Sequence, residues 1–233
     1  NSTYQNKDWT VTDLLKNIGF SRAIFNNLVS KKIFAVEKKQ VSRLLSFDDD
    51  VVERSSLVEF QKEALKQVNI CFQEKSTCLL HGVTSSGKTE LYINLIHDEL
   101  EKGKQVLYLL PEIALTNQII KRLQRHFGDK VGVFHSHLSS SEQVEVWQAV
   151  NASNENRMSY QIIIGVRSSL FLPFNNLGLI IVDEEHDSSF KQRNPSPRYH
   201  ARDTAIYLAK LHKANILLGS ATPSMETYYN ACT

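Results

Sequence analysis

Residues Gly82 to Thr89 read Gly-Val-Thr-Ser-Ser-Gly-Lys-Thr, a spacing of residue types that suits a chain of phosphates. Glycines at both ends permit backbone angles that turn several N–H groups toward one anion. Lys88 can reach the β- and γ-phosphates of ATP, and the Thr89 hydroxyl can hold Mg²⁺. We therefore predict an ATP-binding loop made of Gly82, Val83, Thr84, Ser85, Ser86, Gly87, Lys88 and Thr89.

A pair of carboxylates follows the apolar run from Leu179 to Val182. Ligands of open α/β sheets bind at the ends of such strands. Asp183 would hold Mg²⁺, and Glu184 would orient and deprotonate the attacking water. An acidic turn after a buried strand is the other interpretation, but the glycine loop earlier in the chain favours hydrolysis. We predict that the catalytic residues are Lys88, Asp183 and Glu184.

Ser220-Ala221-Thr222 follows another apolar run, Ile216 to Leu218. Small hydroxyl residues at a strand end can hydrogen-bond to a neighbouring carboxylate or histidine. Taken alone, the segment is typical of a turn.

These residues need an alternating set of elements to position them. We expect strands over 77–81, 106–110, 131–134, 161–165, 179–183 and 216–219, and helices over 90–100, 114–127, 142–150 and 200–211. The strands are continuous apolar runs and the helices are amphipathic, which indicates a parallel sheet with helices on both faces. The predicted fold class is therefore α/β.

The chain before this region has a different pattern, and we expect two domains, 1–50 and 51–233. Thr12 and Ser21 can each begin a short helix, the second with Ile24, Phe25, Leu28 and Val29 facing inward. A short strand over 33–36 would complete a small winged-helix domain. Its basic residues are either a solvated surface, the commoner case, or a DNA contact.

Composition sets limits on these interpretations. The 233 residues are 42% hydrophobic and carry a net charge of only +2, so a generally basic nucleic-acid coat is excluded and any DNA contact must be local. No apolar run reaches the length of a membrane span, and the polar start is not a signal peptide. We expect a cytoplasmic protein with no membrane partner.

The three motifs, in this order, resemble those of superfamily 2 helicases: Gly82 to Thr89 as motif I, Asp183-Glu184-Glu185-His186 as motif II and Ser220-Ala221-Thr222 as motif III. The resemblance is closer to the bacterial replication-restart helicases, through Leu110 to Thr116, Gly165 to Phe171, Asp187 to Gln192 and Arg198 to Asp203. It covers residues from about 60 to 228 and implies a RecA-like lobe with a P-loop, preceded by the winged helix.

The resemblance also implies roles for single residues. Gln61 stands where the family has a glutamine that recognises adenine, and His186 would couple motif II to Ser220 and Thr222. The implied DNA-binding residues are Thr116, Arg167, Phe190, Arg198, Tyr199 and His200, the last four in an aromatic-rich loop. This loop departs from the family at Pro197, where a tryptophan is usual, so base stacking would fall to Phe190 and Tyr199.

The resemblance implies an ATP-dependent DNA helicase that moves along single-stranded and forked DNA and works with other primosome proteins in replication restart. Motifs IV to VI of a second lobe do not follow motif III, and the family's zinc-binding cysteines are absent. We therefore expect a fragment that binds ATP and Mg²⁺ but cannot unwind DNA, with zinc only in the missing part. The alternatives are a lobe of another superfamily 2 translocase, or a nucleotide-gated DNA-binding module without motor action.

Overall fold

The computed structural model describes residues 21–34, 51–52, 54, 56–84, 86–151 and 159–233. The chain divides into two units, Asn1–Ser42 and Arg43–Thr233. Within the described residues, no helix combines the length and the apolar character that a lipid bilayer requires of a spanning segment.

The first unit contains helix α2 (Arg22–Ser30), which begins where the sequence predicts because the Ser21 hydroxyl accepts the N–H of Ile24 at 3.3 Å. Phe25 is buried, but Ile24 is 50% exposed, so the prediction that it faces inward is wrong. Ile33 and Phe34 lie in a bend, so the strand predicted over 33–36 does not form there. The helix predicted from Thr12 lies outside the described residues, and the winged helix stays a prediction.

The second unit is built on one parallel sheet of six strands in the order β1-β6-β5-β2-β4-β3. All six strands were predicted, with bounds that differ by at most two residues. They are β1 (Thr77–His81), β2 (Gln105–Leu109), β3 (Val131–Phe134), β4 (Ile162–Gly165), β5 (Leu177–Asp183) and β6 (Asn215–Ser220).

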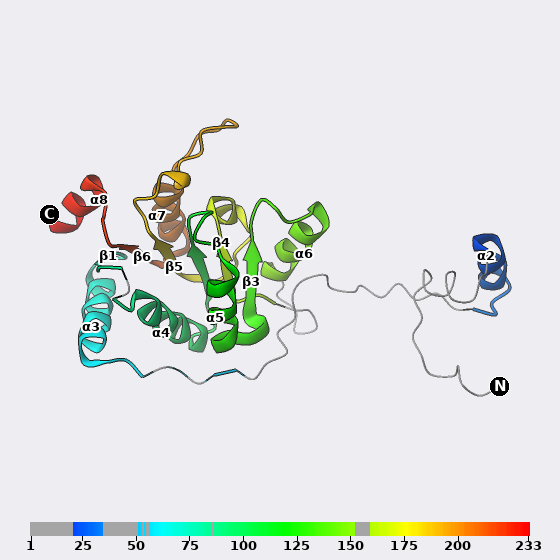
Figure 1. Cartoon of the computed structure of the whole chain (residues 1–233), viewed down its shortest axis with the longest axis horizontal. Helices are drawn as coiled ribbons and strands as arrows, with labels where there is room; N and C mark the ends of the chain where they lie inside the picture. The colour runs from blue at the N-terminus through cyan, green and yellow to red at the C-terminus, as the bar shows by residue number, and fades with distance from the viewer. Residues whose placement is uncertain (1–20, 35–50, 53, 55, 85, 152–158) are drawn as a thin grey trace. The chain divides into compact units, whose positions relative to one another are not determined.

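Helices cover both faces of this sheet (Figure 1), as the sequence predicts. Strand residues alternate between two cores: Tyr108 and Ile181 face one side, and Leu107 and Ile180 face the other. The first core is closed by α3 (Glu59–Glu74), α4 (Lys88–Glu101) and α5 (Asn117–Phe127), and the second by α6 (Ser140–Val150) and α7 (Ala201–His212).

Two helices of this unit were not predicted. Helix α3 is capped by Val58, whose side chain cannot accept a hydrogen bond, so the usual signal for a helix start is missing. Helix α8 (Met225–Cys232) has only eight residues, and among them only Thr227 is buried. The helix predicted over 114–127 begins three residues later, at Asn117, because a turn follows Pro111 and the backbone of Thr116 is extended.

The register of the sheet brings the predicted motifs to one edge. His81, the last residue of β1, pairs with Ser220 on β6. Asp183, the last residue of β5, pairs with Gly219 on the other side of β6. The segments that follow β1, β5 and β6 therefore begin side by side at the carboxyl edge of the sheet, where ligands of open α/β folds bind.

Candidate functional site

The glycine loop lies between β1 and α4, in the context that its pattern requires. The Gly82 N–H donates to the carbonyl oxygen of Ser220 at 3.0 Å, which ties the loop to β6. Gly87 caps α4 with φ +82°, a left-handed conformation that side chains disfavour. Ser85 lies outside the described residues. The start of α4 directs its first N–H groups and its positive dipole end toward the loop, as an anion site needs.

Lys88 lies inside this loop and is 9% exposed. Its Nζ donates to the carbonyl oxygen of Gly82 at 2.7 Å and to that of Val83 at 3.3 Å. A cation buried against neutral carbonyl groups gains from a bound anion, because a buried charge is costly until it is paired. Thr89 follows in the first turn of α4 and is half-buried.

Gln61, in the first turn of α3, packs against the same loop. Its Oε1 accepts the N–H of Val58 at 3.1 Å, and the side chain is buried. Its Nε2 lies so close to Gly87 that a Cβ at that position would overlap it. The structure thus brings Gln61 to the glycine loop, and its selectivity for adenine stays a prediction.

Two tyrosine hydroxyls hold the Asp183 carboxylate. Tyr92 donates to Oδ1 and Tyr108 donates to Oδ2, each at 3.0 Å. Burial raises the pKa of Asp183 above its ordinary value, whereas the hydrogen bonds from Tyr108 and Tyr92 act in the opposite direction. Burial also raises the pKa of both phenols, so both remain protonated donors at neutral pH.

Glu184 adopts an unusual backbone conformation, with φ +51°. A residue other than glycine in this region carries strain of order 1–3 kcal/mol, and such strain clusters at functional sites. Its N–H donates to Oδ1 of Asp183 at 3.2 Å, and its side chain is 35% exposed. The conformation directs a solvent-accessible carboxylate out of a strand end, which suits a residue that orients water.

His186 joins motif II to motif III. Its Nδ1 lies 2.8 Å from the Ser220 hydroxyl, and its Nε2 lies 3.3 Å from the Thr222 hydroxyl. Its Nδ1 is also 3.7 Å from Oε2 of Glu184. The predicted coupling residues are therefore in direct contact, and the ring also lies close to the predicted catalytic carboxylate.

The segments predicted to bind DNA meet around Arg167, after β4. Its Nη1 donates to the carbonyl oxygens of Ser189 and Lys191, at 3.2 and 3.3 Å, and its Nη2 lies 3.7 Å from Oε1 of Glu112. The Tyr199 hydroxyl donates to the carbonyl oxygen of Arg167 at 3.3 Å. Arg167 thus fixes the base of the aromatic-rich loop, and its side chain remains 28% exposed.

Phe190 does not fit the role that the sequence predicts. It is 1% exposed and belongs to the core beneath α7. A ring that is already packed in a core cannot stack on a DNA base in this conformation, so the stacking assignment to Phe190 is wrong. Burial of this ring is favourable because it removes apolar area from water.

The exposed aromatic ring at this place is Phe171, which is 64% exposed and meets Tyr199 edge to face at 5.2 Å. Beyond them, residues 191–200 form an arm that is closed by an antiparallel bridge between Lys191 and His200 (Figure 1). Arg198 lies exposed on the arm, while Tyr199 and His200 are half-buried at its base. Thr116 is exposed in front of α5.

Several residues of the site were missed by the sequence analysis. Tyr92 and Tyr108 carry no motif. Tyr108 reaches Asp183 because β2 pairs with β5, and Tyr92 reaches the same carboxylate from α4. The sequence shows Glu185 only as the third residue of motif II, whereas the structure shows it fully buried and paired with Arg202. The position of Tyr92, four residues after Lys88 on one helix face, was the available signal.

Proteins named Replication restart protein PriA are similar to this chain. The one from Synechocystis sp. is 43% identical over 97% of the chain, and the one from Bacillus subtilis is 38% identical over 94%. The one from Haemophilus influenzae is 42% identical over 94%. The chain spans 26%, 27% and 30% of the lengths of these three relatives.

Solved structures share the fold at lower sequence identity. The structure of RecG bound to a three-way DNA junction superimposes with a TM-score of 0.54 and 24% identity, over 76% of this chain and 22% of RecG. The restriction-modification enzyme LlaBIII bound to DNA gives 0.50 and 16%, over 73% of this chain and 13% of its own. Residues 58–231, most of the chain and all of its motifs, match the DEAD/DEAH box helicases, and the chain belongs to this family.

Proposed function

We propose that this chain is the ATP-binding lobe of an ATP-dependent DNA helicase that acts in replication restart and primosome assembly. The observation that carries the proposal is the meeting of Lys88, Asp183 and His186 at one edge of the sheet, through the contacts of β1, β5 and β6. Relatives named as replication restart proteins support the biological setting.

DEAD/DEAH box helicases use ATP and Mg²⁺, and the described residues fit both. The loop from Gly82 to Thr89 would bind the phosphates, with Lys88 as the cation and Gln61 as the adenine contact. Thr89 and Asp183 would hold Mg²⁺, and Glu184 would orient and deprotonate water. The bound metal would neutralise charge on the phosphates. Lys88, a buried cation beside a helix N-terminus, suits the phosphates. Asp183, a buried carboxylate held by hydrogen bonds, suits the metal ion.

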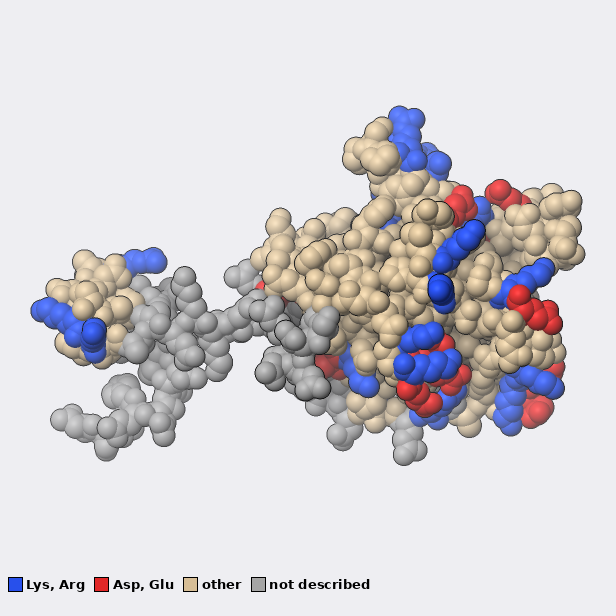
Figure 2. All heavy atoms as spheres, turned by 180° about the vertical axis from the view of Figure 1, so that it is seen from behind, with Lys and Arg blue, Asp and Glu red and all other residues tan. Residues whose placement is uncertain are grey.

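The DNA-binding role rests on the segments around the arm. Thr116, Arg167, Arg198, Tyr199 and His200 would contact single-stranded or forked DNA. Figure 2 shows Lys and Arg side chains on the part that projects from the folded unit, and the arm contains Lys191, Arg193 and Arg198 with no acidic residue. Phosphate contacts by such side chains give affinity without sequence preference. Base stacking would fall to Tyr199, beside Phe171.

His186 would carry the state of the nucleotide to motif III, because its ring touches both Ser220 and Thr222. The proposal also includes other primosome proteins as partners, a cytoplasmic location, and zinc in regions of the protein outside this chain. Each of these follows the names of the relatives and the resemblance of the motifs. For the chain by itself we propose binding of ATP with Mg²⁺ without strand separation.

The test is the ATPase rate of the full-length protein with and without forked DNA. Lys88→Ala should lower the DNA-stimulated rate by at least about 10²-fold, because one preorganised charge at a reacting group has an effect of that order. Lys102→Ala is the matched control, since Lys102 ends the same helix and pairs with Glu99 at 2.7 Å. An unchanged rate in the Lys88 variant would refute the role of the loop. Stimulation by duplex but not by forked DNA would favour a double-strand translocase.

A further inference from the structure

Glu185 is the third residue of motif II, and its contacts lead away from the nucleotide site. It is completely buried. Its Oε2 accepts from Nη1 of Arg202 at 3.0 Å and from the Thr227 hydroxyl at 2.9 Å, while its Oε1 accepts the N–H of Ser224 at 2.8 Å. A buried carboxylate with this many donors is held in one orientation.

Arg202 is the centre of this network. It is the second residue of α7 and is 7% exposed. Besides Glu185, its Nη1 donates to the hydroxyls of Ser224 and Thr227, each at 2.9 Å, and its Nη2 donates to Oε2 of Glu226 at 3.2 Å. One planar guanidinium thus joins motif II, the first turn of α7 and the first turn of α8.

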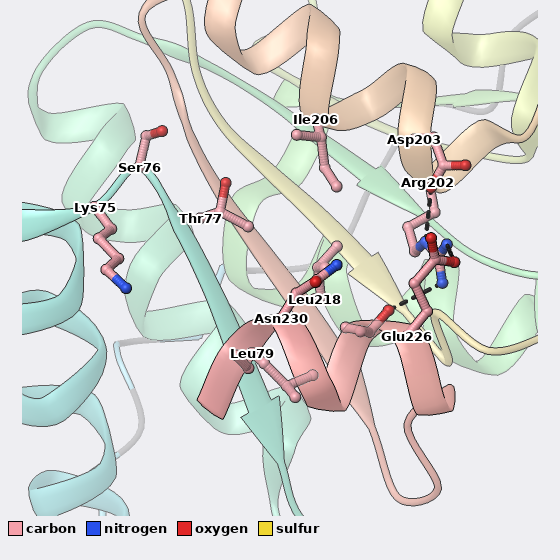
Figure 3. Close-up of a pocket in the computed structure, with 12 residues that line it drawn as sticks. Lys75, Ser76, Thr77, Leu79, Arg202, Asp203, Ile206, Leu218, Glu226 and Asn230 are labelled. Carbon is pink, nitrogen blue, oxygen red and sulfur yellow. Dashed lines mark hydrogen bonds and ion pairs between the residues drawn. The ribbon is translucent and has the colours of Figure 1, made fainter. Parts of the chain in front are cut away.

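The network lies at the edge of a cavity. Arg202, Glu226 and Thr227 line a cavity of about 510 Å³ beside β1. Figure 3 shows Arg202 reaching from α7 and Glu226 reaching from α8, with dashed bonds between the two helices. Atoms that face a cavity have no packing partners on that side. If these hydrogen bonds broke, few van der Waals contacts would replace them.

The three segments that Arg202 joins have different places in the proposed function. Arg202 follows directly on Tyr199 and His200, at the base of the arm. Glu185 stands between Glu184, with its left-handed backbone, and His186. Helix α8 follows motif III. A shift at the base of the arm would therefore move Arg202 and Glu185, and Glu185 is covalently joined to Glu184, the residue that would orient water.

We propose that Arg202 is a positioning residue that transmits the DNA-bound state of the arm through Glu185 to Glu184 and His186, and so sets how strongly DNA stimulates hydrolysis. The inference rests on the proposed function. A purely apolar contact could hold these segments together as well as an ion pair does. The planar guanidinium of Arg202 instead allows only one arrangement of its partners. A contact with a single arrangement can favour one of two conformations of the segments that it joins.

The experiment uses the full-length protein with a single-stranded oligonucleotide and a forked DNA. Arg202→Lys keeps the charge but loses the fork, and Glu185→Gln with Arg202→Gln replaces the ion pair by a neutral amide pair. The ATPase rate is measured with and without DNA, together with DNA affinity and the thermal midpoint. Nucleotide affinity, measured with and without DNA, reports the coupling without relying on turnover, because coupling between two binding sites is reciprocal.

For both variants we expect the ratio of stimulated to basal rate to fall by roughly 10-fold, and the effect of DNA on nucleotide affinity to fall with it. In Arg202→Lys, the basal rate and the affinity for DNA without nucleotide should change less than about threefold. Arg54→Lys is the matched control, because Arg54 pairs with Asp98 on α4, away from motif II, and this variant should keep full stimulation.

An unchanged stimulation ratio in either folded variant would overturn the inference. So would an equal fall of basal and stimulated rates together with a lower thermal midpoint, which is the mark of a purely structural ion pair. If the unchanged protein itself shows no stimulation by DNA, the proposed function fails and this inference fails with it. Loss of stimulation confined to the two network variants supports both.

Discussion

The hydroxyl of Tyr108 donates a hydrogen bond to Oδ2 of Asp183, while Tyr92 donates to Oδ1 of the same carboxylate. The two rings meet edge to face, with centroids 5.6 Å apart. Tyr92 comes from α4, which begins at the glycine loop, and Tyr108 comes from β2, the strand next to β5. The predicted Mg²⁺-binding carboxylate is therefore fixed by two elements that its own motif does not contain.

We expect Tyr108→Phe and Tyr92→Phe to raise the Mg²⁺ concentration needed for half-maximal ATPase activity and to lower the maximal rate. A hydrogen bond to a charged group contributes roughly 1.5–3 kcal/mol, so each change should cost about 10-fold in the rate at limiting Mg²⁺. The measurement is a Mg²⁺ titration of the DNA-stimulated rate. Tyr207→Phe, on the exposed side of α7, is the control. Identical Mg²⁺ curves for all three variants would show that the phenols do not position Asp183.

The contact between Gln61 and Gly87 gives a second prediction. Gly87→Ala would place a Cβ on Nε2 of Gln61 and would force alanine into a left-handed backbone at φ +82°. That conformation costs roughly 1–2 kcal/mol, and the overlap adds to it. Nucleotide affinity, measured by titration, should therefore fall by more than 10-fold, a factor that corresponds to about 1.4 kcal/mol.

A second substitution separates the two causes. Gln61→Ala removes the overlap but not the backbone strain, and it also removes the proposed adenine contact. The loss of nucleotide affinity in Gly87→Ala combined with Gln61→Ala should therefore be smaller than the sum of the two single losses. Gly103→Ala is the matched control, because Gly103 also has a positive φ but no heavy atom lies within 4 Å of its Cβ position. Strictly additive losses in the double variant would argue against a direct contact.

The sheet and its carboxyl edge could be predicted because the strands are continuous apolar runs and the motifs stand at their ends. Leu179 to Asp183 and Ile216 to Gly219 show this, since their predicted bounds differ from the observed ones by at most two residues. The contacts between motifs could not be predicted in the same way. They depend on strand order, and nothing in the sequence places β6 between β1 and β5.

Burial explains what was missed at Phe190 and Arg202. The sequence indicates that Phe190 belongs to a loop but not on which side of that loop its ring lies, and the structure places the ring in the core. Likewise Arg202 is recognised as a charged residue at the start of a helix, a position that is usually solvated. Only the proximity of Glu185, Ser224 and Thr227 explains why this guanidinium is buried.

Two half-buried histidines, His97 on α4 and His126 on α5, lie with their rings 6.4 Å apart and predict a dependence of stability on pH. Burial lowers the pKa of His97 below its ordinary value of 6.5, and Arg54 and His126 act in the same direction, against Glu101 and Asp98. Burial also lowers the pKa of His126, with Arg122 in the same direction and Glu90 opposed. At neutral pH both rings are therefore uncharged in the folded state. The stability they contribute is fully present above pH 6.5 and is lost as pH falls through their lowered pKa values.

The measurement is the thermal midpoint at about pH 7.5 and about pH 5.5, where a histidine of ordinary pKa changes charge. His97→Gln with His126→Gln should reduce the fall in midpoint between these two conditions by a few °C, since about 1 kcal/mol corresponds to roughly 2–4 °C for a domain of this size. His137→Gln, at an exposed position, is the control. An equal fall in all three proteins would assign the acid sensitivity to other groups.

Gly219 gives the sharpest test of how motif II is positioned. A Cβ at this residue would overlap the Tyr92 hydroxyl and would lie 3.3 Å from Oδ1 of Asp183. Gly219→Ala should therefore displace the phenol, and it should raise the Mg²⁺ requirement at least as much as Tyr92→Phe does. The ring of Tyr92 is fully buried, so it has little space in which to move aside.

Removal of the hydroxyl relieves the overlap, and Gly219→Ala combined with Tyr92→Phe should be more stable and more active than Gly219→Ala alone. This partial rescue is the non-additivity expected of residues in contact, of order 0.5–3 kcal/mol in a double-mutant cycle of thermal and denaturant unfolding. If the double variant were as impaired as the sum of the two single changes, Gly219 would act through the backbone of β6 and not through the Tyr92 hydroxyl.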